Sequence, residues 1–200
     1  MADILIFGNT YLSAKCCEAL SSAGHYLLGY VPNVNPPTVP GKMPIPKAGD
    51  WVILCGEFDF VLSIQYDERI LLTTPAYNVH TGLLPEWGGM DILYHTLRLG
   101  AREQGLTFHR VTPVFDEGPI LSRMTYPVFP DDTIVDLYER RATIAPGFTV
   151  AAVDLLLAIG QDRARRCQRC HPNMFRRGQI NREDLDEYYR TPTILRRHFR

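Results

Sequence analysis

The chain opens with a short apolar run, a glycine turn and an amphipathic helix, and this order constrains its fold most strongly. Residues 3–7 form the apolar run, Gly8 ends it, and residues 11–23 space their apolar side chains as a helix does. A continuous apolar strand is typical of a parallel sheet that is covered on both faces by crossover helices. We therefore expect the first βα unit of an α/β domain here.

Strand and helix signals continue to alternate along the chain. Strands are expected at 26–31, 59–64, 77–80, 107–115 and 120–128. Helices are expected at about 91–101 and from an N-cap at Asp131-Asp132-Thr133 to about residue 159, with an interruption near Pro146-Gly147. This order predicts a Rossmann-like, mostly parallel sheet flanked by helices, with an antiparallel hairpin near residues 116–118.

Residues 32–50 are rich in proline, which occupies positions 32, 36, 37, 40, 44 and 46. Proline lacks a backbone N–H donor, so helix interiors and central strands exclude it at this density. We expect the usual crossover to be shortened in this region.

Size and composition fit an ordinary globular chain. The 200 residues are 46% hydrophobic and 22% charged, which excludes disordered and collagen-like classes. The first residues lack the basic region of a signal peptide, and no run approaches the roughly 20 uninterrupted apolar residues that span a bilayer. We expect a cytoplasmic protein without membrane association, whose five cysteines are reduced.

Charge is divided unevenly between two parts of the chain. Residues 1–160 hold 10 Lys and Arg against 17 Asp and Glu, whereas residues 161–200 hold 11 against 5. We expect one folded domain over 1–160 and a short Arg-rich C-terminal extension over 161–200, with a weak helix pattern at 182–190. The extension either presents a solvated charged face or binds an anionic group.

The extension also contains two cysteines followed by a histidine. Cys167, Cys170 and His171 match the pattern that attaches c-type haem, but the chain shows no export signal. A zinc site needs a further ligand, and no second cysteine pair supplies it. We favour two surface thiols and expect no metal. The acidic pairs 131–132 and 183–184 are interpreted as helix-start residues.

Polar side chains interrupt the apolar strand expected at 77–80. Because side chains alternate along a strand, Asn78 and His80 share one face and Val79 points to the other. Two polar groups near the end of a buried strand are costly unless they are paired or used. Ligands of open α/β sheets bind at this end of the strands. The pattern indicates either a functional pair or a hydrogen-bonded structural pair.

An aspartate follows the next expected strand. Asp116 comes after the strand predicted at 107–115, and Gly118 permits a tight reversal directly behind it. It lies 36 positions beyond His80, about the distance of one crossover helix plus a strand, so the two side chains can meet. Capping of the turn is the alternative role for this aspartate.

These two segments resemble the folate-dependent formyltransferases, whose members act on methionyl-tRNA, glycinamide ribonucleotide and nucleotide sugars. That family carries Asn-x-His-x-x-x-Leu-Pro followed by a glycine, then Gly-x-Thr and Asp-x-Gly-x-Ile. The matching residues here are Asn78, His80, Leu84, Pro85, Gly89, Gly105, Thr107, Asp116, Gly118 and Ile120. A looser likeness extends over residues 4–159. The basic residue that often precedes the family's glycine is replaced within residues 86–89.

The resemblance implies that 10-formyltetrahydrofolate donates its formyl group to a primary amine. Asn78 and His80 are expected to stabilise the oxyanion that forms when the amine attacks, while Asp116 orients His80 and helps to move the amine proton. The expected cofactor-binding residues are Ile64, Gln65, Tyr66, Asp67, Ile70, Thr112, Val114 and Phe115. The expected substrate-binding residues are Gly8, Asn9, Thr10, Trp87 and Gly89, of which the first three form a generic anion site at a helix N-terminus.

The length of the chain narrows the range of candidate formyl acceptors. Methionyl-tRNA formyltransferases carry a second, β-rich domain for tRNA, which we do not expect from the 40 residues after Gly160. Glycinamide ribonucleotide transformylases have a longer phosphate loop after the first strand. We therefore expect an amino sugar nucleotide as acceptor, with another small amine (an amino acid or hydroxyornithine type) as the alternative, and no nucleic-acid partner.

Two alternatives from other functional classes stay open. The chain could hydrolyse formyltetrahydrofolate with water as the acceptor, or it could be a non-catalytic folate- or nucleotide-binding module. The sequence does not determine the oligomeric state, and a homodimer stays open.

Overall fold

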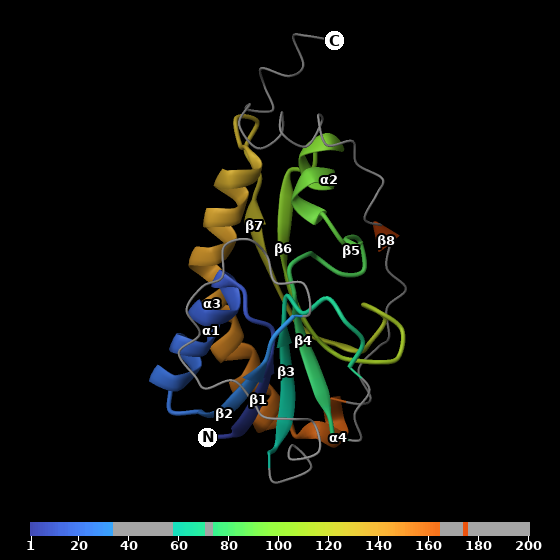
Figure 1. The fold of residues 1–200 in the computed structure, drawn as a ribbon. Helices are drawn as coiled ribbons and strands as arrows, with labels where there is room; N and C mark the ends of the chain where they lie inside the picture. Colours follow the sequence, from blue (N-terminus) through green and yellow to red (C-terminus); the bar gives the residue numbers. More distant parts are fainter. Residues whose placement is uncertain (34–57, 71–73, 165–173, 176–200) are drawn as a thin grey trace.

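The computed structural model describes residues 1–33, 58–70, 74–164 and 174–175 of the chain (Figure 1). Most of the proline-rich segment, the Cys167–His171 motif, the weak helix pattern at 182–190 and Glu183-Asp184 lie outside the described residues. The elements are, in chain order, β1 (Asp3–Phe7), α1 (Tyr11–Ser22), β2 (Tyr26–Val31), β3 (Phe60–Ile64), β4 (Ala76–His80), β5 (Gly88–Gly89), α2 (Ile92–Arg98), β6 (Glu103–Arg110), β7 (Ile120–Pro127), α3 (Ile134–Ile159), α4 (Gln161–Ala164) and β8 (Met174–Phe175).

Six strands form one mixed sheet in the order β2-β1-β3-β4-β6-β7. The first four pair in parallel, whereas β6 runs antiparallel to both β4 and β7. This confirms the predicted α/β class, with a parallel first half and an antiparallel hairpin at the far side of the sheet. The carboxyl ends of β1, β3 and β4 therefore lie along one edge.

Helices α1 and α3 pack side by side on one face of this sheet (Figure 1). The main hydrophobic core lies between them and the sheet, and includes the fully buried Leu12, Leu20, Phe60 and Tyr77. A smaller apolar cluster on the opposite face includes Phe7, Val31 and Val61. Because strands β1 and β3 are buried on both faces, their apolar runs are continuous, as the sequence indicated.

Helix α3 is continuous, so the predicted interruption at Pro146-Gly147 is wrong. Proline at position 146 removes one helical hydrogen bond, but the buried Ala142, Ala145 and Phe148 keep the helix packed on both sides of it. Thr133 is the N-cap, and its side chain exchanges hydrogen bonds with Asp136 in a capping box.

The predicted caps at positions 131–132 take a different form. Asp132 accepts a hydrogen bond from the Phe129 amide at 2.7 Å and pairs with Arg140 at 2.6 Å, so it closes the turn ahead of the helix.

By length and composition, α3 also passes the test for a membrane-crossing helix. That test is weak evidence, because core helices of globular domains satisfy it too. The buried side chains of α3 recur at helical spacing, for example Leu137, Arg141, Ala145, Phe148 and Ala152. This face packs on α1, β6 and β7. A cytoplasmic location stays a prediction.

Strand β6 begins and ends earlier than the sequence indicated. It spans 103–110 rather than 107–115, because the chain leaves the sheet at Val111 and makes a turn that carries Asp116. Pro113, which lies within the predicted strand, cannot donate to a strand ladder, in agreement with the early end.

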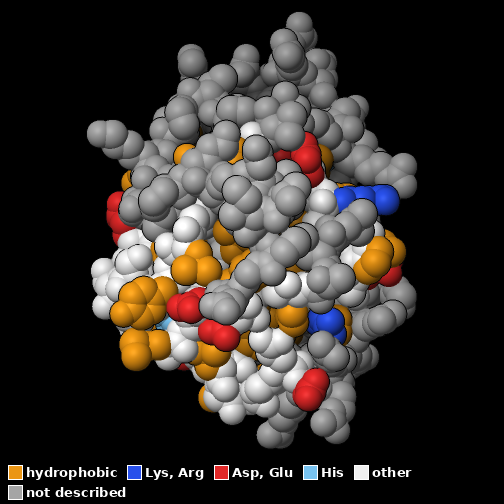
Figure 2. Space-filling model, turned by 60° about the horizontal axis from the view of Figure 1, so that its bottom comes forward, with side chains coloured by type: hydrophobic (Ala, Val, Ile, Leu, Met, Phe, Trp, Pro, Cys, Tyr) orange, Lys and Arg blue, Asp and Glu red, His pale blue; other side chains and the backbone are white. Residues whose placement is uncertain are grey.

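Part of the C-terminal extension lies against the loop that follows β4. Met174 and Phe175 form β8, which pairs in parallel with Gly88 and Gly89 of β5. The division at residue 160 into a domain and an extension stays a prediction. On the face shown in Figure 2, the coloured acidic side chains are scattered between hydrophobic groups rather than gathered in one patch.

Candidate active site

Strand β4 carries Asn78 and His80 to the carboxyl edge of the parallel sheet. The neighbouring strand β6 is antiparallel, and its register places His109 opposite Asn78 and Thr107 opposite His80. Strand alternation puts these four side chains on one face. His80 and His109 are buried, and Asn78 is half-buried.

Asp116 enters the same site from the turn after β6. Its backbone has a φ of +59°, a left-handed conformation that aspartate tolerates better than most side chains. Gly118 allows the turn to close, since a Cβ there would lie 1.5 Å from the Arg110 carbonyl oxygen. Asp116 is buried; its Oδ1 lies 3.4 Å from Nδ1 of His80, and its Oδ2 accepts a hydrogen bond from the Gly89 amide at 2.7 Å.

The two ring nitrogens of His80 face different oxygen atoms. Nε2 lies 2.7 Å from the Trp87 carbonyl oxygen, while Nδ1 faces Asp116. A ring protonated on both nitrogens can donate to each of them. Gly82 lies against this contact, because a Cβ at that position would be 2.4 Å from the Trp87 carbonyl oxygen and 2.8 Å from His80 Nε2.

His109 is a site residue that the sequence analysis did not predict. Its Nε2 lies 3.1 Å from Nδ2 of Asn78 and 3.8 Å from Oδ1 of Asp116, and its Nδ1 lies 3.0 Å from the Arg110 carbonyl oxygen. Burial and the neighbouring His80 lower the pKa of His109 to about 4, despite the opposing effect of Asp116. The signal that could have found it is the period-two spacing of Thr107 and His109 beside a strand that carries Asn78 and His80.

Two buried side chains of β6 hold the loop after β4 in place. Gln104 accepts hydrogen bonds from the amides of Leu83 and Gly105, both at 2.9 Å. Thr107 accepts from the Leu84 amide at 2.9 Å and donates to the Gly82 carbonyl at 2.8 Å. The Leu84–Pro85 peptide bond in this loop is cis. The loop that brings Trp87 and Gly89 to the site is therefore held by hydrogen bonds to side chains of β6.

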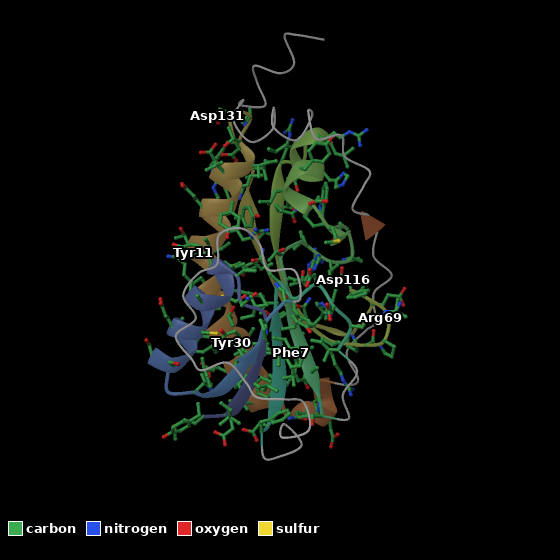
Figure 3. The ribbon with its side chains drawn as sticks, viewed as in Figure 1. Phe7, Tyr11, Tyr30, Arg69, Asp116 and Asp131 are labelled. Atoms are coloured by element: carbon green, nitrogen blue, oxygen red, sulfur yellow. The ribbon has the colours of Figure 1, made fainter. Side chains whose placement is uncertain are left out.

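A small cavity of about 40 Å³ opens beside this cluster, and Asn78, His109 and Asp116 lie in its wall. Five of the predicted cofactor-binding residues also line it, namely Tyr66, Ile70, Thr112, Val114 and Phe115. Figure 3 shows Asp116 and Arg69, another lining residue, on the side of the sheet away from Tyr11 of α1. His80 lies behind this wall, in contact with Asp116.

The remaining predicted cofactor residues do not line this cavity. Ile64 is a fully buried core residue, and Asp67 is exposed. Gln65 has a φ of +53° and accepts a hydrogen bond from the Thr10 hydroxyl at 2.7 Å, while its backbone carbonyl accepts one from the Asn33 side chain.

The predicted substrate residues fall into two groups. Gly8, Asn9 and Thr10 follow β1: Gly8 donates to the Val31 carbonyl at 2.9 Å, Asn9 Oδ1 lies 3.4 Å from the Asn33 amide, and Thr10 caps α1. Trp87 and Gly89 instead contact the His80–Asp116 pair through backbone atoms. The described part of the chain holds no group of three or more His, Cys, Asp or Glu side chains that could bind a metal ion.

Comparison with known proteins points to one family. Residues 68–153 match the family described as formyl transferase. The methionyl-tRNA formyltransferase of Methylococcus capsulatus is 32% identical over 96 residues, which are 46% of this chain and 30% of that protein. The corresponding enzyme of Porphyromonas gingivalis is 36% identical over 80 residues, 40% of this chain and 25% of that protein. The chain thus spans less than a third of the length of these curated relatives.

Solved structures share the fold at lower identity. An N-formyltransferase from Helicobacter canadensis, in complex with folinic acid and dTDP-3-aminofucose, superposes with a TM-score of 0.74 at 16% identity, over 90% of this chain and 73% of that one. Phosphoribosylglycinamide formyltransferase from Bacillus halodurans gives a TM-score of 0.62 at 16% identity, over 77% of this chain and 95% of that one. Residues 68–153 are therefore similar to the formyl transferase family, and the sheet described above has the fold of the solved formyltransferases.

Proposed function

We propose that this chain is an N-formyltransferase that moves a formyl group from 10-formyltetrahydrofolate to a primary amine. The observation that carries the proposal is the convergence of Asn78 and Asp116 on the wall of one cavity, with His80 in contact with Asp116 behind it. The match of residues 68–153 to the formyl transferase family supports it.

The folate donor is proposed to enter between the loop after β3 and the turn after β6. Tyr66 and Ile70 supply one wall and residues 112–115 the other. A volume of about 40 Å³ holds only one or a few water molecules. The exposed side chains of Val114 and Phe115 must therefore move aside when a bicyclic pterin ring binds.

In the proposed reaction, the amine nitrogen attacks the formyl carbon. The π electrons of the formyl C=O bond move onto the oxygen, which becomes an oxyanion. The Asn78 amide, which lines the cavity, is the direct hydrogen-bond donor to this oxygen; such a donor is typically worth roughly 3–4 kcal/mol. When the bond from the formyl carbon to N10 of the folate breaks, N10 takes up the proton that the amine has released by way of Asp116, and tetrahydrofolate leaves.

His80 and Asp116 are proposed to act as a pair in this step. Asp116 receives the amine proton directly or through water, and it holds the His80 ring by its contact with Nδ1. His80, when protonated, adds positive charge next to the developing oxyanion. Its Nε2 is bonded to the Trp87 carbonyl, so direct donation to the oxyanion requires that contact to open.

An amino sugar nucleotide is the proposed acceptor. The fold supports this choice, because sugar N-formyltransferases are among the solved structures that superpose with TM-scores of 0.68–0.74. The sequence relatives favour a second candidate, the amino group of methionyl-tRNA, since those proteins are methionyl-tRNA formyltransferases. Residues 1–160 are proposed as the catalytic domain, and the basic residues of 161–200 as a contact for a phosphorylated acceptor.

Mass spectrometry of acceptor candidates incubated with 10-formyltetrahydrofolate tests the proposal. The panel contains amino sugar nucleotides, hydroxyornithine-type amines, amino acids and methionyl-tRNA. A mass gain of one formyl group identifies the acceptor, and His80→Ala serves as the inactive control. Release of tetrahydrofolate without any amine indicates a hydrolase, and folate binding without turnover indicates a binding module.

A further inference from the structure

The amide of Asn78 faces the ring of His109 across the β4–β6 ladder. The two residues are register partners, and Nδ2 of Asn78 lies 3.1 Å from Nε2 of His109. His109 is 2% exposed, so its ring is surrounded by protein groups. Among the described residues, the polar groups near its ring include the Asn78 amide, the Arg110 carbonyl, the Asp116 carboxylate and the ring of His80, whose centroid is 6.3 Å away.

These contacts select one tautomer of His109. Nδ1 lies 3.0 Å from the Arg110 carbonyl oxygen, which can only accept, so Nδ1 carries the proton. Nε2 of the neutral ring then offers a lone pair, and the Asn78 amide donates to it. The Asp116 carboxylate, at 3.8 Å, is beyond hydrogen-bond distance of Nε2.

A neutral ring agrees with the electrostatics of the site. Burial and the adjacent His80 hold the pKa of His109 well below its ordinary value. At neutral pH the Nε2 lone pair is therefore available to Asn78.

The consequence concerns the orientation of the Asn78 side chain. A side-chain amide has two N–H bonds on one end and a carbonyl oxygen on the other. Rotation by 180° would place the carbonyl oxygen of Asn78 against the Nε2 lone pair, which is repulsive. His109 thus holds the NH₂ end in place and leaves its second N–H for the cavity that Asn78 lines.

We propose that His109 is a positioning residue for the formyl transfer: its neutral Nε2 fixes the Asn78 amide so that an N–H, not the carbonyl oxygen, meets the formyl oxygen. This inference rests on the proposed function for its catalytic consequence. The geometric part, a neutral ring with the proton on Nδ1, can be measured without any turnover.

The test compares His109→Met with His109→Gln in formyl transfer. Methionine removes the acceptor, and we expect kcat to fall roughly tenfold or more, with a smaller change in KM for the folate. Glutamine can place a carbonyl oxygen where Nε2 lies, and we expect it to retain kcat within about fivefold of wild type.

A double-mutant cycle separates positioning from simple structural support. Asn78→Ala is expected to lower kcat by roughly 10²–10³-fold, and adding His109→Met should then change kcat by less than about twofold. Multiplicative effects of the two substitutions, or equal losses in His109→Met and His109→Gln, would overturn the inference.

Nitrogen-15 NMR of the wild-type chain supplies a readout that does not depend on turnover. With His109→Gln used to assign the signal, we expect a protonated Nδ1 and an unprotonated Nε2 at pH 7. The opposite tautomer or a doubly protonated ring contradicts the inference. If this tautomer is found but no amine is formylated, the proposed function fails while the geometry of the pair stands.

Discussion

The Gly89 amide donates to Oδ2 of Asp116 at 2.7 Å, while Oδ1 of the same carboxylate lies 3.4 Å from Nδ1 of His80. Asp116 therefore ties the loop after β4 to the strand that carries His80. The hydrogen bond from the Gly89 amide needs only an oxygen acceptor on residue 116. Attraction to a protonated His80 needs the negative charge of the carboxylate. A substitution that keeps the oxygen and removes the charge separates the two roles.

We predict that Asp116→Asn lowers kcat for formyl transfer by at least about 100-fold, because it removes the group proposed to take the amine proton. The Asn oxygen can still accept from Gly89, so folate affinity and the thermal midpoint should stay close to wild type. Steady-state kinetics and thermal denaturation check both. Asp131→Asn, on an exposed aspartate outside the site, is the matched control and should stay within twofold of wild-type kcat. Wild-type turnover in Asp116→Asn would remove Asp116 from the mechanism.

A second prediction concerns the contact between His80 and the Trp87 carbonyl. Gly82→Ala would place a methyl group 2.4 Å from that carbonyl oxygen and 2.8 Å from His80 Nε2. The loop must shift to relieve the overlap, and we expect a destabilisation of about 1–3 kcal/mol. Activity should fall by a larger factor than the unfolded fraction explains, as measured by kinetics alongside urea unfolding.

Gly147→Ala is the control for this substitution. Gly147 is exposed within α3, and an added Cβ there meets nothing within 4 Å. Alanine should stabilise the helix by up to about 1 kcal/mol and leave turnover unchanged. Equal activity losses for the two alanine variants would show that the Gly82 contact has no special role.

The sequence predicted the fold class from local patterns, and it predicted the meeting of His80 with Asp116 from the length of chain between them and from the family resemblance. An apolar run that ends at a glycine turn before a helix indicates a parallel strand, and period-two alternation puts Asn78 and His80 on one face. The continuity of α3 through Pro146 was not predictable in this way, since packing on the sheet outweighs the cost of one missing helical bond.

The parts of the site that the sequence did not predict depend on how the strands pair and on how the loops fold over them. His109 becomes a partner of Asn78 only through the antiparallel pairing of β4 with β6, and a one-residue shift would turn it to the other face. Gln104 likewise holds Leu83 only because the loop after β4 folds over β6. Backbone roles such as those of Trp87 and Gly89 leave no side-chain signal in a sequence.

The depressed pKa of His109 leads to a prediction about stability. Its pKa in the folded chain is about 4, below its ordinary value of 6.5. Between these two pH values His109 is therefore protonated in the unfolded chain and neutral in the folded chain. The free energy of unfolding should therefore fall as pH falls from about 6.5 towards 4, by on the order of 2 kcal/mol from this residue between pH 7 and 5. Above pH 7 the contribution of His109 is fully present.

Urea unfolding of wild type and His109→Gln at pH 7 and 5 measures this contribution. The wild type should lose more stability than the variant over that interval, because glutamine does not titrate. Equal losses in the two proteins would show that the His109 ring does not resist protonation.

The last prediction tests how the loop after β4 is held. Thr107 is completely buried, accepts from the Leu84 amide and donates to the Gly82 carbonyl. Thr107→Val keeps the shape but leaves both backbone groups without this partner, and we expect a loss of about 2–4 kcal/mol in the free energy of unfolding. Thr143→Val, on the exposed face of α3, replaces a hydroxyl that donates to the Glu139 carbonyl and should stay within about 0.5 kcal/mol of wild type. Because Gly82 and Leu84 flank the segment that leads to Trp87, kcat of the folded Thr107→Val protein should also fall. Unchanged stability and kcat would mean that the other contacts of the loop, led by Gln104 with Leu83, are sufficient to hold it against the site.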